Sequence, residues 1–138
     1  LEKGYRSLGS DIHTNTNPYE SGLGFTVKLK KDTDFIGKEA LSKIKEAPIQ
    51  KKLACMVMDD SEGMALGTEP IYSDGKAVGY VTSTNYGYFV DKHIVYGYLP
   101  SELSFTGTKL ELEYFGKRYP LTVTTEPLLD PENTRLKS

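Results

Sequence analysis

The stretch Pro70-Ile71-Tyr72-Ser73-Asp74-Gly75-Lys76-Ala77-Val78-Gly79-Tyr80-Val81 decides the fold of this chain. Asp74-Gly75 is typical of tight two-residue hairpin turns, and runs rich in strand-forming residues lie on both sides of it. A second glycine turn, Tyr114-Phe115-Gly116-Lys117, is placed in the same way between two such runs. The sequence therefore predicts consecutive antiparallel hairpins.

The chain from residue 51 onward contains further strand candidates, with no helical periodicity between them. Gly, Asp and Pro turns separate these candidates at intervals of about a dozen residues. The candidates span residues 52–58, 69–73, 76–85, 93–99, 109–115 and 117–125. About six short strands without intervening helices favour a small closed or nearly closed antiparallel barrel, because closure hides the sheet edges.

The first 50 residues have a different pattern. Residues 1–24 are dense in Gly, Asn, Thr and Ser, which predicts loops and turns. Residues 24–30 alternate at period two, which predicts a strand that buries Phe25, Val27 and Leu29. Residues 35–46 predict a short amphipathic helix, capped by Asp34 and ended at Pro48. Its apolar stripe consists of Ile36, Ala40, Leu41 and Ile44. The expected fold class is α+β and mainly β, with a short mixed N-terminal segment followed by the barrel.

Composition and charge exclude several classes of protein. The 138 residues are 38% hydrophobic and 26% charged, the composition of a soluble globular domain. Seventeen basic and 19 acidic side chains give a net charge of -2, so neither nucleic acid nor a membrane is an expected partner. The apolar runs are also too short for a membrane-spanning helix.

The reactive side chains are few. The lone Cys55 cannot form an internal disulfide, and its place in an apolar strand is typical of a buried structural thiol. His13 and His93 match no metal-ligand spacing, so no metal site is expected. The chain lacks the Gly-x-Ser-x-Gly, Walker and Gly-x-Gly-x-x-Gly motifs. No catalytic residue is therefore assigned within this chain.

Some side chains could contact a ligand, but each has a structural alternative. The ten tyrosines offer rings that can stack on a planar ligand, although tyrosines in a Trp-free β domain more often fill the core. Glu20 lies in a glycine-rich turn, where its carboxylate can pair with the N–H groups of a heterocycle or cap local backbone amides. Arg135 could clamp a carboxylate or remain solvated near the C-terminus.

Three motifs follow one another along the first part of the chain: Leu1-Glu2-Lys3-Gly4-Tyr5-Arg6, Asn17-Pro18-Tyr19-Glu20-Ser21-Gly22-Leu23 and Asp34-Phe35-Ile36-Gly37-Lys38-Glu39-Ala40-Leu41. Two more follow, Val78-Gly79-Tyr80-Val81-Thr82-Ser83 and Gly97-Tyr98-Leu99-Pro100. Together they resemble the aminomethyltransferase family, which contains the T-protein of the glycine cleavage system. The resemblance implies that residues 1–50 are the incomplete C-terminal end of the folate-binding domain. Residues 51–138 would then be the C-terminal β-barrel domain and its tail.

Two further runs, Asn85-Tyr86-Gly87-Tyr88 and Glu126-Pro127-Leu128-Leu129-Asp130-Pro131, are more similar to dimethylglycine and sarcosine dehydrogenases than to the free T-protein. This resemblance implies a parent enzyme in which FAD, bound outside these 138 residues, oxidises an N-methylated glycine and tetrahydrofolate accepts the one-carbon unit. The resemblance also implies that the family's catalytic carboxylate lies upstream of Leu1. The chain has no initiator Met, so it is expected to be part of a larger protein. The alternatives are a free-standing T-protein and a non-catalytic regulatory homologue.

The resemblance also implies three cofactor-binding residues. Tyr5 matches a folate-contacting tyrosine of the family, Glu20 lies in the matching turn, and Arg135 matches a terminal arginine that can approach the glutamate tail of folate. The expected partners are folate, the N-methylated substrate and the remainder of the parent chain. The expected compartment is the bacterial cytoplasm or, in a eukaryote, the mitochondrial matrix.

Overall fold

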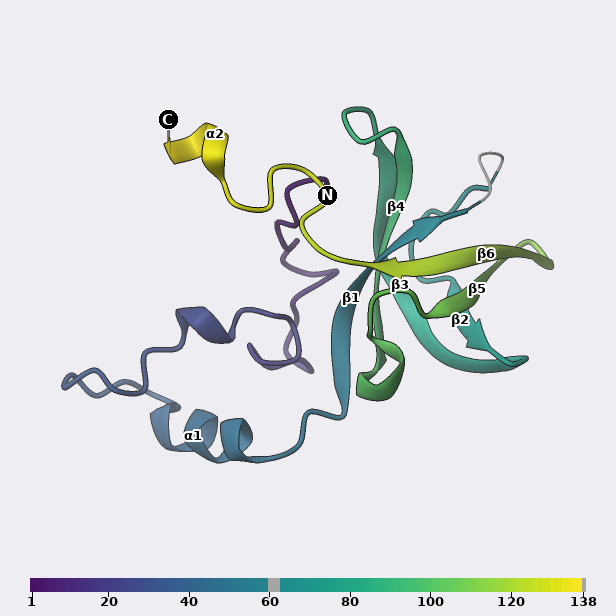
Figure 1. Ribbon diagram of the computed structural model, residues 1–138. Helices are drawn as coiled ribbons and strands as arrows, with labels where there is room; N and C mark the ends of the chain where they lie inside the picture. The colour runs from purple at the N-terminus through teal and green to yellow at the C-terminus, as the bar shows by residue number, and fades with distance from the viewer. Residues whose placement is uncertain (60–62, 138) are drawn as a thin grey trace.

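The computed structural model describes residues 1–59 and 63–137, and its centre is a closed antiparallel β-barrel (Figure 1). The strands are β1 (Lys51–Met58), β2 (Pro70–Ser73), β3 (Lys76–Gly87), β4 (Lys92–Pro100), β5 (Lys109–Tyr114) and β6 (Lys117–Thr124). Around the barrel they follow the order β1-β4-β3-β2-β5-β6, and β1 pairs with both β4 and β6. The predicted mainly β class and six-strand antiparallel barrel are confirmed.

The two turns that predicted hairpins have the geometry that their residues favour. Asp74 and Gly75 have φ angles of 49° and 77°, and Phe115 and Gly116 have φ angles of 48° and 74°. Two consecutive positive φ values define the tight turn whose twist matches that of paired strands. The second turn sets the register of β5 with β6, and the first sets the pairing of Tyr72 and Ser73 with β3. The β2–β3 register then shifts between Ile71 and Tyr72.

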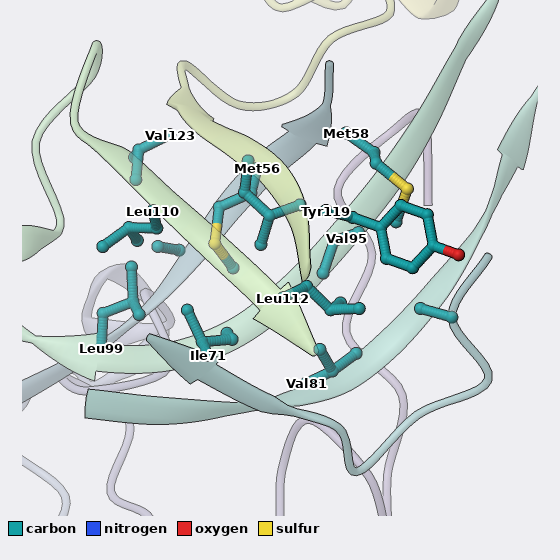
Figure 2. Packing of buried hydrophobic residues seen from close by; sticks show 13 residues of the cluster. Met56, Met58, Ile71, Val81, Val95, Leu99, Leu110, Leu112, Tyr119 and Val123 are labelled. Atoms are coloured by element: carbon teal, nitrogen blue, oxygen red, sulfur yellow. The ribbon is translucent and has the colours of Figure 1, made fainter. Parts of the chain in front are cut away.

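The barrel interior is filled by aliphatic, methionine and tyrosine side chains from all six strands (Figure 2). Met56, Ile71, Leu112 and Leu121 are completely buried there. Full burial of one such side chain stabilises the fold by about 1.5–3 kcal/mol. The interior is therefore a packed core, as expected for a small barrel.

The outer surface of the barrel is not uniform. On β5 and β6 buried and exposed residues alternate, which is the pattern of a sheet with one solvated face. On β1 and β4 most residues are buried on both faces. Their outward side chains form a second apolar cluster, consisting of Leu53, Cys55, Ile94, Tyr96 and Tyr98. Another part of the chain must therefore cover the β1–β4 side.

Residues 1–24 provide that cover, and we call them the N-terminal layer. Residues 1–23 consist of turns and irregular backbone with a single parallel bridge between Leu8 and Ile12, and Gly24 begins a 3-10 helix of one turn. The prediction that no regular element here is longer than a turn is confirmed. Leu1 packs on the outer cluster together with Leu128, which lies near the other end of the chain. In Figure 1 the N-terminal layer and the C-terminal tail lie next to each other beside the barrel.

The strand predicted for residues 24–30 is wrong. Gly24–Thr26 forms a short 3-10 helix, η1, and Phe25 is 72% exposed instead of buried. The six barrel strands pair with one another in a closed ring, so a further strand has no free edge to join. Alternation in sequence was therefore not sufficient for a strand here.

The predicted helix is present but shorter and uncovered. α1 spans Lys38–Glu46, and Gly37, with a φ angle of 89°, precedes it in place of the predicted cap Asp34. No residue of α1 is buried, and Ile36, predicted to lie on its apolar stripe, is fully exposed outside the helix. The remaining helical elements are η2 (Ser101–Leu103) and α2 (Thr134–Lys137). Within residues 1–59 and 63–137, no helix has the length and apolar character needed to span a membrane.

Candidate functional site

The N-terminal layer carries two of the three predicted binding residues, so its attachment to the barrel determines the site. Two hydrogen bonds fix it to neighbouring strands. The backbone N–H of Leu53 in β1 donates to the carbonyl of Glu20 over 2.8 Å, and the hydroxyl of Tyr98 in β4 donates to the carbonyl of Asp11 over 2.8 Å. Leu53 and Tyr98 face each other in the β1–β4 register, so both bonds lie at one level of the barrel.

Asp11 is a buried carboxylate at the centre of this attachment. Its side chain is 1% exposed, and its Oδ1 accepts a 2.5 Å hydrogen bond from the hydroxyl of Thr82 in β3. Its Oδ2 accepts a 2.8 Å bond from the backbone N–H of Ser7. A buried charge must be hydrogen-bonded to be tolerated, and Asp11 satisfies this by joining the layer to the barrel.

Arg6 makes a second attachment, to the C-terminal side of the barrel. Its guanidinium forms a two-pronged ion pair with Glu126, with distances of 2.5 Å and 2.9 Å. It also donates to the carbonyls of Gly4 and Ser21, and it lies 5.2 Å from the centre of the Tyr96 ring. The Arg6 side chain is only 8% exposed. Planar, two-pronged pairing of this kind fixes orientation as well as distance.

The C-terminal tail, residues 126–137, closes over the first residues of the layer. The Lys3 ammonium donates to the Asp130 carbonyl and to Asn133 Oδ1, over 3.0 Å and 2.7 Å. The backbone N–H of Leu129 donates to the carbonyl of Glu2 over 2.9 Å. The two ends of the chain are therefore bonded directly to each other beside β4.

Tyr5 is the first predicted binding residue, and it has an anchored backbone and a free ring. Its neighbour Gly4 has a φ of 69° and lies so close to Tyr96 that an added Cβ would be 3.3 Å from the Tyr96 hydroxyl. Its other neighbour, Arg6, is held by Glu126. Tyr5 itself is 70% exposed. The ring is thus presented outward on a fixed backbone, which suits a contact surface better than a core position.

Glu20 is half-buried in a turn organised by Asn17. Asn17 Oδ1 accepts hydrogen bonds of 3.0 Å from the backbone N–H groups of Tyr19 and Glu20. Glu20 Oε2 accepts a 3.1 Å bond from the backbone N–H of Asn17 in return. This is the local capping arrangement that the sequence left open for Glu20. It uses one carboxylate oxygen of Glu20.

Arg135 lies in the terminal helix α2, whose start is fixed by Asp130. The Asp130 carboxylate accepts hydrogen bonds from the Thr134 hydroxyl and backbone N–H and from the backbone N–H of Arg135. The bond from the Thr134 hydroxyl, with these N–H groups and Lys3, lowers the pKa of Asp130 to about 2. Asp130 therefore stabilises both α2 and the junction of the two chain ends.

The buried Cys55 thiol and Tyr96 hydroxyl beneath the layer are not activated for chemistry. Burial raises the pKa of the Cys55 thiol to about 11, so Cys55 stays protonated at neutral pH. Cys55 is 1% exposed, as predicted for a structural thiol. Burial likewise raises the pKa of Tyr96. In the described part of the chain, no group of three or more His, Cys, Asp or Glu side chains is arranged to hold a metal ion.

The structure brings Tyr5 and Glu20 onto one layer but not into contact. Among the described residues no hydrogen bond or ring contact joins them, although both are tied to the β1–β4 side. An exposed ring, a carboxylate and a guanidinium suit a planar heterocycle with an anionic tail. Because Tyr5 faces outward, the chain by itself would supply only one wall of such a site. The residues thus fit folate in part.

Sequence reasoning missed the residues that hold this layer in place: Arg6, Asp11 and Glu126. Arg6 and Glu126 are 120 positions apart, and no local pattern links them. Asp11 lies in a polar run that predicts an exposed loop. The one available signal was the nearly continuous apolar sequence of β1 and β4, which indicates strands covered on both sides.

With the barrel and its covering layer described, the class of protein can be stated. The family model of the glycine cleavage T-protein C-terminal barrel domain matches residues 51–130. The chain belongs to this family, as its sequence motifs indicated.

Individual relatives extend the similarity to the N-terminal layer. The chain is 40% identical to the mitochondrial dimethylglycine dehydrogenase of Rattus norvegicus and 36% identical to the mitochondrial sarcosine dehydrogenase of Homo sapiens. Each match covers 99% of this chain but only 16% of the relative. A crystal structure of the glycine cleavage system aminomethyltransferase T from Bartonella henselae has the same fold, with a TM-score of 0.83. That match is 24% identical and covers 94% of this chain and 37% of the other.

Proposed function

We propose that this chain is the C-terminal part of a tetrahydrofolate-linked dehydrogenase or oxidase that demethylates an N-methylated glycine. The observation that carries the proposal is the match to dimethylglycine and sarcosine dehydrogenases over 99% of the chain. That match includes the N-terminal layer as well as the barrel. The barrel would support the layer, and the layer would supply one wall of the folate site.

The geometry supports separate roles for the three predicted residues. Tyr5, with its exposed ring on a fixed backbone, would stack on or hydrogen-bond the folate. Glu20 would offer the carboxylate oxygen that does not cap Asn17. Arg135 would approach the anionic glutamate tail from α2.

The redox and one-carbon chemistry would lie outside these residues. FAD bound elsewhere in the parent would supply the oxidation of the N-methyl group, and tetrahydrofolate would accept the one-carbon unit before it is released as formaldehyde. The sequence contains no dinucleotide-binding glycine motif, which agrees with FAD binding elsewhere in the parent. This chain would contribute by binding and orienting folate. The mitochondrial matrix would be its compartment in a eukaryote, and the cytoplasm in a bacterium.

A free-standing aminomethyltransferase is the second candidate, because the fold match to the Bartonella henselae protein covers 94% of this chain. In that case the one-carbon donor would be an aminomethyl group and no flavin would be bound. A non-catalytic regulatory homologue would retain the barrel and layer without either activity.

The test uses the full-length protein encoded by the reading frame that contains this chain. We expect a flavin absorption spectrum, oxidation of dimethylglycine or sarcosine, and formation of 5,10-methylenetetrahydrofolate in place of formaldehyde when tetrahydrofolate is added. Formation of methylenetetrahydrofolate from an aminomethyl donor without flavin would establish the second candidate. Neither activity, in a folded protein, would favour the regulatory homologue. The 138-residue chain alone should show no activity and bind no FAD.

The Tyr5→Ala variant of the full-length protein tests the folate wall directly. Loss of an aromatic contact should weaken folate binding by about 1–3 kcal/mol, while the melting temperature stays close to that of wild type. Calorimetric titration and a thermal melt of the same sample separate the two effects. Unchanged folate affinity would remove Tyr5 from the binding site.

A further inference from the structure

The C-terminal tail contacts four residues that surround Tyr5 in the sequence. The residues that it contacts are Glu2, Lys3, Gly4 and Arg6. Their partners in the tail are, in the same order, Leu129, Asn133, Pro127 and Glu126. Tyr5, which is 70% exposed, therefore lies between residues that the tail holds on both sides.

The Arg6 guanidinium connects the tail to the peptide group of Tyr5. Two of its nitrogens donate to the Glu126 carboxylate, over 2.9 Å and 2.5 Å. The nitrogen that donates over 2.9 Å also donates to the Gly4 carbonyl over 2.7 Å. That carbonyl belongs to the planar peptide group between Gly4 and Tyr5, so the guanidinium fixes the plane from which the Tyr5 residue starts.

The Arg6 side chain is not itself placed to bind a ligand, because it is only 8% exposed. Its Nε donates to the Ser21 carbonyl, and with the three bonds just described four of its five N–H donors are used. Any effect of Arg6 on a ligand at the surface therefore passes through the backbone of Tyr5.

The tail also has an attachment to the barrel that does not involve Tyr5. Leu128 packs on the outer apolar cluster of β1 and β4. The carboxylate of Glu126 reaches Arg6 instead, and this contact leaves the Tyr5 ring exposed. The bonds of the tail thus order the backbone around Tyr5 without burying its ring.

We propose that the C-terminal tail positions Tyr5 for folate, and that the Arg6–Glu126 pair is the contact that transmits this effect. The inference rests on the proposed function, in which the Tyr5 ring contacts folate. Arg6 and Glu126 are positioning residues, because they hold the backbone that carries the ring. A side chain on a fixed backbone loses less conformational freedom when a ligand binds, so the tail raises the affinity for folate without touching it.

Calorimetric titration of the full-length protein with folate tests the proposal through a double-mutant cycle. Glu126→Gln should weaken folate binding five- to tenfold when Tyr5 is present, because Gln lacks the charge that holds Arg6. In the Tyr5→Ala background the same change should alter the dissociation constant less than twofold, since no ring remains to be positioned. A purely structural role of the pair would weaken binding by the same factor in both backgrounds.

Glu113→Gln is the matched control for this cycle. Glu113 pairs with Arg118 over 2.9 Å in the β5–β6 hairpin, and each side chain is 33% exposed. The variant removes an ion pair of the same kind from the barrel wall, so it should leave folate affinity unchanged. Equal weakening of folate binding by Glu113→Gln and Glu126→Gln would overturn the proposal, because a general loss of stability would then explain both.

Gly4→Ala disturbs the same backbone without removing a charge. Gly4 has a φ of 69°, and an added Cβ would lie 3.3 Å from the Tyr96 hydroxyl and 3.4 Å from the Pro127 Cβ. The substitution should displace the Tyr5 peptide and weaken folate binding at least threefold, again only where Tyr5 is present. Gly116→Ala is its control, because Gly116 has a φ of 74° and no described atom lies within 4 Å of the added Cβ.

The outcomes distinguish the positioning role from the proposed function. If Tyr5→Ala weakens folate binding but Glu126→Gln and Gly4→Ala act equally with and without the ring, the folate contact of Tyr5 stands and the positioning role is rejected. The positioning role is also rejected if neither change alters folate affinity when Tyr5 is present. If Tyr5→Ala itself has no effect, the folate contact of Tyr5 is rejected and its positioning by the tail with it.

Discussion

The N-terminal layer and the segment of residues 25–47 are adjacent in sequence and equally poor in strands, yet only one of them is packed on the barrel. The layer contains buried Asp11 and Ser21, and hydrogen bonds fix it to the strands β1, β3 and β4. The second segment has the clearer apolar periodicity, and neither of its helical elements contains a buried residue. The segment that packs on the barrel is thus the one whose polar groups hydrogen-bond to the strands, and not the one with the clearer apolar periodicity.

The difference has a physical reason. An apolar stripe only needs some other apolar surface, which can come from elsewhere in a longer protein. A buried carboxylate or guanidinium needs specific partners at hydrogen-bond distance, so it commits a segment to one place. Asp11 and Arg6 fix the layer in one place in this way, whereas none of residues 25–47 is buried.

Removal of Asp11 should have the largest effect on this contrast. Asp11→Ala leaves the Thr82 hydroxyl and the Ser7 N–H without their acceptor in a buried site. We expect the free energy of unfolding of the isolated chain to fall by about 3 kcal/mol, measured by urea denaturation. Asp32→Ala, at an exposed position of the second segment, is the matched control and should change it by less than about 0.5 kcal/mol. Equal effects would mean that the layer is not held by Asp11.

The Arg6–Glu126 pair should contribute less, because Glu126 is 30% exposed and can be solvated when its partner is lost. Arg6→Met should lower the free energy of unfolding by about 2 kcal/mol through lost hydrogen bonds. A double-mutant cycle with Glu126→Gln should give a coupling of about 1 kcal/mol. Lys45→Met, in the second segment, serves as control and should be neutral. A coupling near zero would show that Arg6 acts through its hydrogen bonds to the carbonyls of Gly4 and Ser21 and its packing on Tyr96, and not through Glu126.

Much of the barrel was predictable from the sequence, for reasons visible in particular residues. Asp74-Gly75 and Phe115-Gly116 fix two hairpins locally. The period-two patterns of β5 and β6 arise because one face of these strands is buried and the other is exposed to solvent. All six strands were placed within two residues of their observed ends. Local turn chemistry and alternation carry this information without knowledge of the rest of the fold.

The attachment of the layer was not predictable in the same way. It depends on contacts such as Tyr98 with Asp11, 87 positions apart, and Arg6 with Glu126, 120 positions apart. The wrong strand at residues 24–30 has a related cause, because strand formation needs a partner edge and the closed barrel leaves none. Tyr5, Glu20 and Arg135 came from family resemblance, and their folate contacts remain predictions.

Low pH should weaken the junction of the chain ends through Asp130. The pKa of Asp130 in the folded chain is about 2, below its ordinary value of 3.8, so the charged form is favoured by folding. The stability that it contributes is present above about pH 4 and is lost as the pH falls toward 2. Thermal melts of wild type and Asp130→Asn should therefore differ at pH 5 and converge near pH 2. A constant difference across this range would exclude the Asp130 charge as the cause.

The smallest effect is expected in α1, where local and global stability should separate. Ala40 is exposed in the middle of α1, and Ala40→Gly costs this helix about 1 kcal/mol of intrinsic propensity. Because α1 buries no residue, its loss should not be transmitted to the barrel, and the melting temperature of the isolated chain should not change. Hydrogen exchange should still report faster opening of α1. Ala54→Gly is the matched control: Ala54 is 6% exposed in β1, and the same exchange there should lower the free energy of unfolding by about 1 kcal/mol or more. A drop in melting temperature for Ala40→Gly equal to that for Ala54→Gly would mean that residues 25–47 are coupled to the barrel as firmly as the N-terminal layer, and the contrast between the two segments would fail.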